Sequence, residues 1–270
     1  PEKDRFYSAL AYLAVGLCTM TLLIPILNVL HIPIHYLTFL AISLVYPIYK
    51  ISTDPSYRKS LLKGKDLSFG LDSLKTSNIS LVKIFLVIIF LIYLGVYLKG
   101  AFIYPYLEDD DPWGHAATAQ YIHDFRSYSV PEEKQEIKGN FGHYIEPYPP
   151  TYDAIMSLMW GISSSMNWTL KFTNVLILSL HVFFMFLFAK YFFASKNKAL
   201  AAAFIISILP SSMSHFIWAH SLGMTLLYAC MYITFYSISY FKKHSSISIP
   251  ALLRSSPFLI AIICIAAMMI

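Results

Sequence analysis

Residues 81–104, LVKIFLVIIFLIYLGVYLKGAFIY, are followed closely by residues 108–123, EDDDPWGHAATAQYIH. The first stretch is long and apolar enough to predict a helix that crosses a bilayer. The second opens with four consecutive carboxylates, which are costly to remove from water, so we predict that they lie at the membrane boundary and face a cation or a polar ligand. Asp111 precedes Pro112, a pair typical of a helix N-cap and a first helical residue. A capped helix with an acidic first turn, which the helix dipole favours, is the alternative that needs no function.

The composition indicates an integral membrane protein. Hydrophobic residues make up 57% of the 270 residues, and charged residues only 13%. The formal net charge of +5 does not indicate a nucleic-acid partner, because Lys and Arg are clustered between apolar segments. All three cysteines, Cys18, Cys230 and Cys264, fall within apolar stretches. We therefore interpret them as small buried residues, not as disulfide halves or metal ligands.

Apolar segments elsewhere predict further membrane helices, at residues 9–30, 34–48, 172–193, 199–211 and 222–241 and from 257 onward. The positive-inside rule places the basic clusters in the cytoplasm, at residues 50–75, 196–198 and 242–244. The acidic stretch then lies on the opposite side, within a large external loop at residues 105–170. The predicted fold is all-α, a polytopic transmembrane helical bundle with a structured external loop.

The chain divides into an N-terminal transmembrane hairpin (1–50), a basic cytoplasmic linker (51–80) and a transmembrane core (81–270). It begins without Met and stops within an apolar run, so we expect it to be part of a longer protein.

The external loop carries several recognisable segments. Residues 112–126 predict a short helix, whose spacing puts Asp111, His115, His123 and Arg126 on roughly one face. The charged residues of 129–142 are interpreted as a solvated cluster. Residues 153–166 are apolar but short for a span, so we predict a helix that lies in the membrane interface.

Asp111-Pro112-Trp113, placed after a span and before a short helix, resembles the first external-loop motif of the GT-C superfamily of membrane glycosyltransferases. Within that superfamily the chain is most similar to the oligosaccharyltransferase catalytic-subunit family, whose two acidic places are matched by Asp109 and Asp111. Tyr148-Pro149-Pro150 resembles the family's Tyr-Pro segment. Residues 199–214, ALAAAFIISILPSSMS, resemble a span that ends in a proline at the outer edge. The likeness covers roughly residues 81–240.

The resemblance implies a GT-C-like fold and transfer of a sugar from a polyprenyl-phosphate-type lipid donor to a protein, glycan or lipid acceptor at the external or lumenal membrane face. Asp111 and Asp109 would act as general base or hold Mg²⁺ or Mn²⁺, with His220 as a further metal ligand or phosphate contact. Donor binding is assigned to the remaining candidates: His115, Arg126, Trp113 and Tyr148. The protein would then be a multi-pass protein of the plasma membrane, or of the endoplasmic reticulum membrane in a eukaryote.

Two departures from the family pattern favour an acceptor other than asparagine. Ala117 stands where the family helix carries an Arg, and residues 218–223, WAHSLG, hold no carboxylate where a second acidic motif is expected. A non-catalytic homologue or assembly subunit of the same fold is therefore an alternative. A membrane transporter is another, although it predicts ionisable residues along a path inside the spans, where this chain has almost none.

Overall fold

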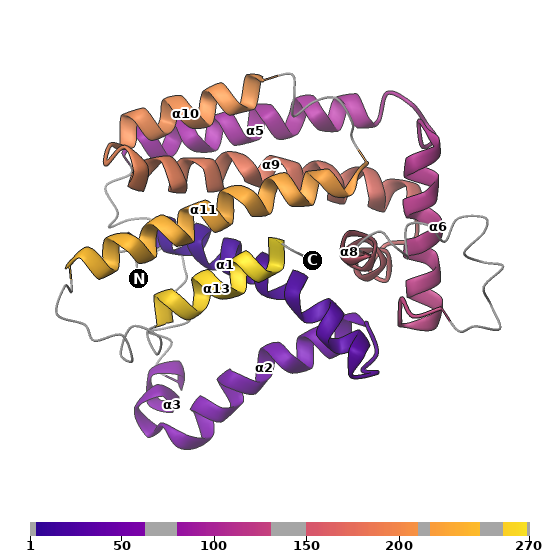
Figure 1. Ribbon diagram of the computed structural model, residues 1–270, viewed down its shortest axis with the longest axis horizontal. Helices are drawn as coiled ribbons and strands as arrows, with labels where there is room; N and C mark the ends of the chain where they lie inside the picture. The colour runs from indigo at the N-terminus through magenta and orange to yellow at the C-terminus, as the bar shows by residue number, and fades with distance from the viewer. Residues whose placement is uncertain (1–3, 63–79, 131–149, 210–216, 244–255, 269–270) are drawn as a thin grey trace.

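The computed structural model describes residues 4–62, 80–130, 150–209, 217–243 and 256–268, and within these ranges it contains helices and no strand (Figure 1). The helices are α1 (Arg5–Val29), α2 (Tyr36–Thr53), α3 (Pro55–Leu62), α5 (Leu81–Ala101), α6 (Asp110–Phe125), α8 (Thr151–Trp160), α9 (Met166–Phe192), α10 (Lys196–Ile208), α11 (Ala219–Lys243) and α13 (Ser256–Met268). The all-α prediction is confirmed for this part of the chain.

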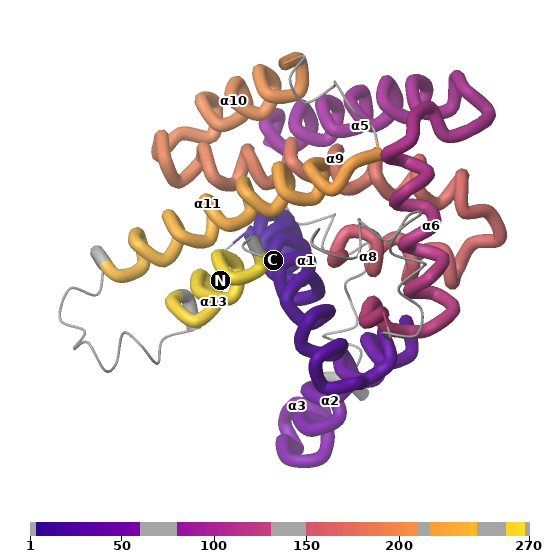
Figure 2. The backbone as a smooth tube through the Cα atoms, turned by 45° about the vertical axis from the view of Figure 1, so that its right-hand side comes forward, coloured from indigo at the N-terminus to yellow at the C-terminus, as the bar shows by residue number. Residues whose placement is uncertain are grey.

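Helix α9 is the centre of the bundle. Apolar residues lie on nearly every side of it, and 78% of its most apolar stretch is buried inside the protein. The helices α5 and α10 pack on one side of α9, while α11 packs on another and is itself joined to α13 and α1 (Figure 2). The long helices therefore run side by side around α9.

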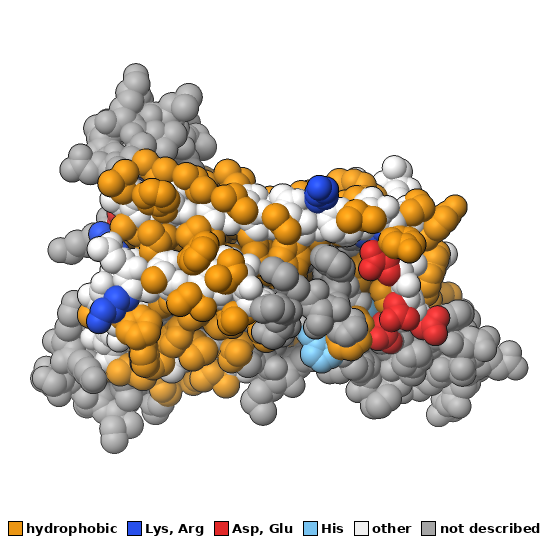
Figure 3. Space-filling model, turned by 90° about the horizontal axis from the view of Figure 1, so that it is seen from above, with side chains coloured by type: hydrophobic (Ala, Val, Ile, Leu, Met, Phe, Trp, Pro, Cys, Tyr) orange, Lys and Arg blue, Asp and Glu red, His pale blue; other side chains and the backbone are white. Residues whose placement is uncertain are grey.

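Four of the described helices are long and apolar enough to cross a membrane: α1, α5, α9 and α11. Hydrophobic side chains cover the face of the molecule formed by α5 and α10 along its length, and acidic side chains gather toward one end (Figure 3). An apolar exterior of this length matches a hydrocarbon environment and not water. The protein is thus a membrane protein with transmembrane helices.

Three predicted spans, α2, α10 and α13, fall outside this set, and the described part of α13 has 13 residues. Helix α10 has 13 residues, which rise about 20 Å, less than the roughly 30 Å of a hydrocarbon core. Helix α2 buries none of its residues and packs on α3, while α1 packs against α13, α11, α9 and α8. The predicted hairpin of α1 and α2 is therefore not a packed helix pair.

Helices α6 and α8 lie together at one end of the bundle (Figures 1 and 2). Every residue of α8 from Thr151 to Leu158 is buried. The prediction of an interfacial helix at residues 153–166 is wrong in this respect, because protein, not lipid, covers α8, and because the helix ends at Trp160. The charged residues 131–142 and most of the linker 51–80 lie outside the described residues.

The three cysteines meet inside the bundle, although they come from α1, α11 and α13. The Cys230 thiol donates to the carbonyl oxygen of Cys264 at 2.8 Å, and the Cys18 thiol lies close to both residues. All three are buried free thiols, which confirms their interpretation as small buried residues.

Candidate functional site

Helix α6 begins within the acidic stretch, and residues 102–109 connect it to the end of α5. Asp109 is its N-cap, with an extended backbone (φ −148°) and a carboxylate that accepts a hydrogen bond from the Asp110 N–H at 2.8 Å. The prediction that Asp111 is the N-cap is wrong, because Asp110 and Asp111 both lie in the first turn. Pro112 is tolerated as the third helical residue, since the first four N–H groups of a helix have no intrahelical acceptor.

The candidate residues along α6 differ in their access to solvent. Asp109 is exposed and Asp111 is half-buried. Trp113 is 51% exposed, whereas His115 is 1% exposed. Asp109, Asp111 and Trp113 are therefore accessible to a ligand, whereas His115 is not.

His115 instead forms the buried link between α6 and α8. Its Nδ1 lies 2.7 Å from Oδ1 of Asp153, and both side chains are almost completely inaccessible to solvent. Burial removes the water that would otherwise hydrogen-bond to each group, and here each group replaces that water for the other. The pair fixes the rotation of α6 against α8, and with it the direction in which the acidic turn faces.

Burial raises the pKa of Asp153 to about 6, and the neighbouring His115 opposes part of that rise. The second carboxylate oxygen, Oδ2, has no hydrogen-bond partner among the described residues. The 2.7 Å contact between His115 Nδ1 and Asp153 Oδ1 is a hydrogen bond whether the shared proton is on the nitrogen or on the oxygen. Asp153 therefore changes its protonation state in a range close to neutral pH.

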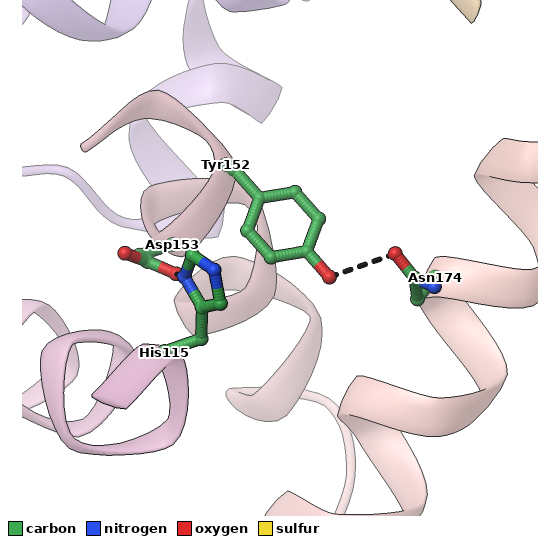
Figure 4. Close-up of polar contacts among 4 residues, drawn as sticks. All are labelled: His115, Tyr152, Asp153 and Asn174. Atoms are coloured by element: carbon green, nitrogen blue, oxygen red, sulfur yellow. Dashed lines mark hydrogen bonds and ion pairs between the residues drawn. The ribbon is translucent and has the colours of Figure 1, made fainter. Parts of the chain in front are cut away.

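Tyr152 extends this network to the central helix α9 (Figure 4). Its hydroxyl donates to Oδ1 of Asn174 at 2.8 Å, and its ring packs edge-on against the His115 ring with centroids 5.0 Å apart. Burial also holds the pKa of Tyr152 well above its usual range, so its hydroxyl keeps its proton. The four residues tie α6, α8 and α9 into one unit.

Lys171 supplies a cation beneath the acidic stretch. It lies in the second turn of α9, is 2% exposed, and its ammonium group donates to the carbonyl oxygen of Tyr104 at 2.6 Å. Its charge also interacts with Glu108. The chain between α5 and α6 is thereby held on α9, and one positive charge offsets the carboxylates.

Arg126 lies far from the acidic turn. It caps the other end of α6 in the left-handed conformation (φ 57°), and its guanidinium contacts Nδ1 of His123 at 3.3 Å. The helical rise separates it from Asp111 by about 22 Å along α6. Arg126 and Asp111 therefore do not act on one small group.

His220 is exposed near the start of α11, with its ring 4.9 Å from that of Trp218. Among the residues that the structure describes, no three His, Cys, Asp or Glu side chains come together to hold a metal ion. The predicted Mg²⁺ or Mn²⁺ site at Asp109, Asp111 and His220 therefore stays a prediction, and we derive no step through a metal. Tyr148 lies outside the described residues.

The fold and the site define an all-helical membrane protein with a polar unit, built by α6 and α8, at one end of its bundle. No family model, no curated protein and no solved structure matches the chain.

Proposed function

We propose that the protein is a membrane glycosyltransferase of the GT-C type. It transfers a sugar from a polyprenyl-phosphate-type lipid to an acceptor at the external or lumenal face. The observation that carries the proposal is the position of Asp111, in the first turn of a polar helix that directly follows the membrane helix α5 and is locked onto α8 by the buried His115–Asp153 pair.

The reaction needs a base at the membrane boundary. An acceptor hydroxyl or amide attacks the anomeric carbon, the bond from that carbon to the lipid phosphate oxygen breaks, and the phosphate leaves with the electron pair. Asp111 accepts the proton that the acceptor loses. Asp109, the N-cap before this turn, is the other candidate carboxylate, although one of its oxygens already accepts from the Asp110 N–H.

The start of α6 also offers an aromatic surface. Trp113, half exposed two residues beyond Asp111, offers a flat apolar surface of the kind that sugars and isoprenoids stack on. In this proposal His115 and Asp153 do not touch the donor; they are positioning residues that hold the turn.

Transfer from defined donors tests the proposal. The purified chain in liposomes is given radiolabelled sugars on polyprenyl phosphate or pyrophosphate, with peptide, glycan and lipid acceptors in parallel. We expect a labelled product with at least one donor. A folded protein that neither transfers sugar nor binds any polyprenyl phosphate would contradict the proposal and leave the non-catalytic homologue as the better interpretation. Chelation of divalent cations in the same assay tests the separate prediction of Mg²⁺ or Mn²⁺.

A further inference from the structure

Three lysines from three different helices converge on one aromatic ring at the end of the bundle opposite α6 and α8 (Figure 1). The ammonium groups of Lys83 (α5), Lys190 (α9) and Lys196 (α10) lie 5.6, 4.3 and 5.8 Å from the centroid of the Tyr7 ring. Each distance is within the range of a cation–π contact. The ring, however, does not neutralise charge, so the three cations also repel one another.

Two of these lysines occupy positions that a helix dipole disfavours. Lys83 is the third residue of α5 and Lys196 the first residue of α10, and neither helix has an acidic residue in its first turn. Cations are stabilising at helix C-termini and destabilising at N-termini. The start of α1 adds a third helix N-terminus at the same place. The fold therefore concentrates positive potential here.

Asp4 offsets part of this potential. Asp4 forms a salt bridge with Lys83, with Nζ and Oδ2 2.7 Å apart. Asp4 is also the N-cap of α1, where its carboxylate accepts from the Phe6 N–H at 3.1 Å. The charge of this one carboxylate is therefore shared between Lys83 and the start of α1.

The surroundings of the cluster are apolar. Leu81 and Phe85, on either side of Lys83, are 71% and 50% exposed, and Phe192 and Phe193, just after Lys190, are 54% and 44% exposed. An anion with apolar chains attached matches both the charge and these side chains, whereas a free anion matches only the charge. Basic pockets between membrane helices on the cytoplasmic side bind anionic headgroups in this way.

We propose that Lys83, Lys190 and Lys196, grouped around Tyr7, bind the phosphate of an anionic phospholipid in the leaflet that faces the basic loops. Exposed lysines that merely extend into water are the ordinary alternative. Lys83, at 9% exposed, does not fit that description.

Native mass spectrometry of the purified full chain tests the proposal, with phosphatidylglycerol and phosphatidylcholine of the same acyl chains as probes. We expect phosphatidylglycerol to bind more tightly. Lys196→Gln should weaken that binding about fivefold, since one lysine near an anionic headgroup contributes about 1 kcal/mol, which is about a fivefold factor. Lys198→Gln is the matched control, because Lys198 is exposed on the same helix, and it should bind like the wild type.

Asp4→Asn should change the affinity for phosphatidylglycerol in the opposite direction. Asn is as good an N-cap as Asp, so α1 remains capped while the competing negative charge is lost. Phosphatidylglycerol affinity should rise about fivefold. Equal affinities for the wild type, Lys196→Gln and Asp4→Asn would overturn the proposal. Full displacement of phosphatidylglycerol by excess inorganic phosphate would also overturn it, by assigning a free phosphate to the site.

Discussion

His115 of α6 and Asp153 of α8 lie 38 residues apart in the chain, yet Nδ1 of one is 2.7 Å from Oδ1 of the other, with both side chains buried. A histidine and an aspartate in the interior need each other, because an unpartnered buried ionisable group is costly. This pair determines how α6 lies on α8. The orientation of the acidic first turn, and of Asp111 within it, depends on the contact.

Removing His115 should therefore destabilise the fold. We expect His115→Leu to lower the free energy of unfolding by about 3 kcal/mol, because Asp153 loses its only described partner. Thermal unfolding in detergent measures the change. The double variant His115→Leu/Asp153→Leu should recover much of the loss, and His123→Leu, a half-buried histidine on the same helix, is the control. Equal losses in the single and double variants would show that the two residues are not coupled.

The stability should depend on pH through Asp153. Its pKa in the folded protein, about 6, lies above the value of 3.8 expected in the unfolded chain. The protonated form is favoured by folding, so this contribution is complete below about pH 4 and is lost as the pH rises through about 6. Relative to Asp153→Asn, which does not titrate, the wild type should lose up to about 3 kcal/mol across this interval. Parallel stability profiles of the two proteins between pH 4 and 6.5, roughly the span of the titration, would contradict the assignment.

The bond from Tyr152 to Asn174 should contribute measurably to the packing of α8 on α9. Tyr152→Phe removes the hydroxyl and leaves Oδ1 of a fully buried Asn174 without its donor. We expect a loss of about 1 to 3 kcal/mol in the free energy of unfolding. Tyr106→Phe serves as the control, since Tyr106 is 70% exposed. A loss no greater than in that control would mean that water replaces the hydroxyl.

The sequence predicted the class of fold and the order of its parts, because both depend on local patterns. The helix expected at residues 112–126 is α6 (Asp110–Phe125), and the apolar stretch before it is α5. The N-cap was misassigned because four successive carboxylates offer several caps and the Asp-Pro pair favours only one of them. The N-cap is the residue whose backbone is extended just before the first helical turn. Among successive aspartates the residue type does not determine which one that is.

The partner of His115 was missed for a different reason. A contact between residues 38 positions apart produces no periodic pattern in the sequence. The available signal was Asp153 itself, a carboxylate in a short apolar helix, which requires a partner if that helix is buried. A helix in the membrane interface, as predicted for this segment, does not require a partner for Asp153, because a carboxylate there can face water.

The sidedness of the protein is a prediction from its basic clusters. Single cysteines at Ser60 and Ser129 are labelled with an impermeant maleimide in intact cells. The three native thiols are buried, so their background should be low. We expect labelling at position 129 and, only after permeabilisation, at position 60. The reverse pattern would overturn the topology, and with it the external position of the acidic turn.

The most direct test of the glycosyltransferase proposal is the transfer rate of Asp111→Asn, measured with a lipid-linked donor that the wild type uses. Asn keeps the size of the side chain and its compatibility with the first turn but cannot take a proton from the acceptor. Asp124→Asn, at the exposed far end of the same helix, is the matched control. We predict that Asp111→Asn loses about 10²- to 10⁴-fold in rate with an unchanged unfolding temperature, while Asp124→Asn keeps the wild-type rate. Transfer by folded Asp111→Asn at the wild-type rate would contradict the catalytic role of this residue and leave the acidic turn as a helix start alone.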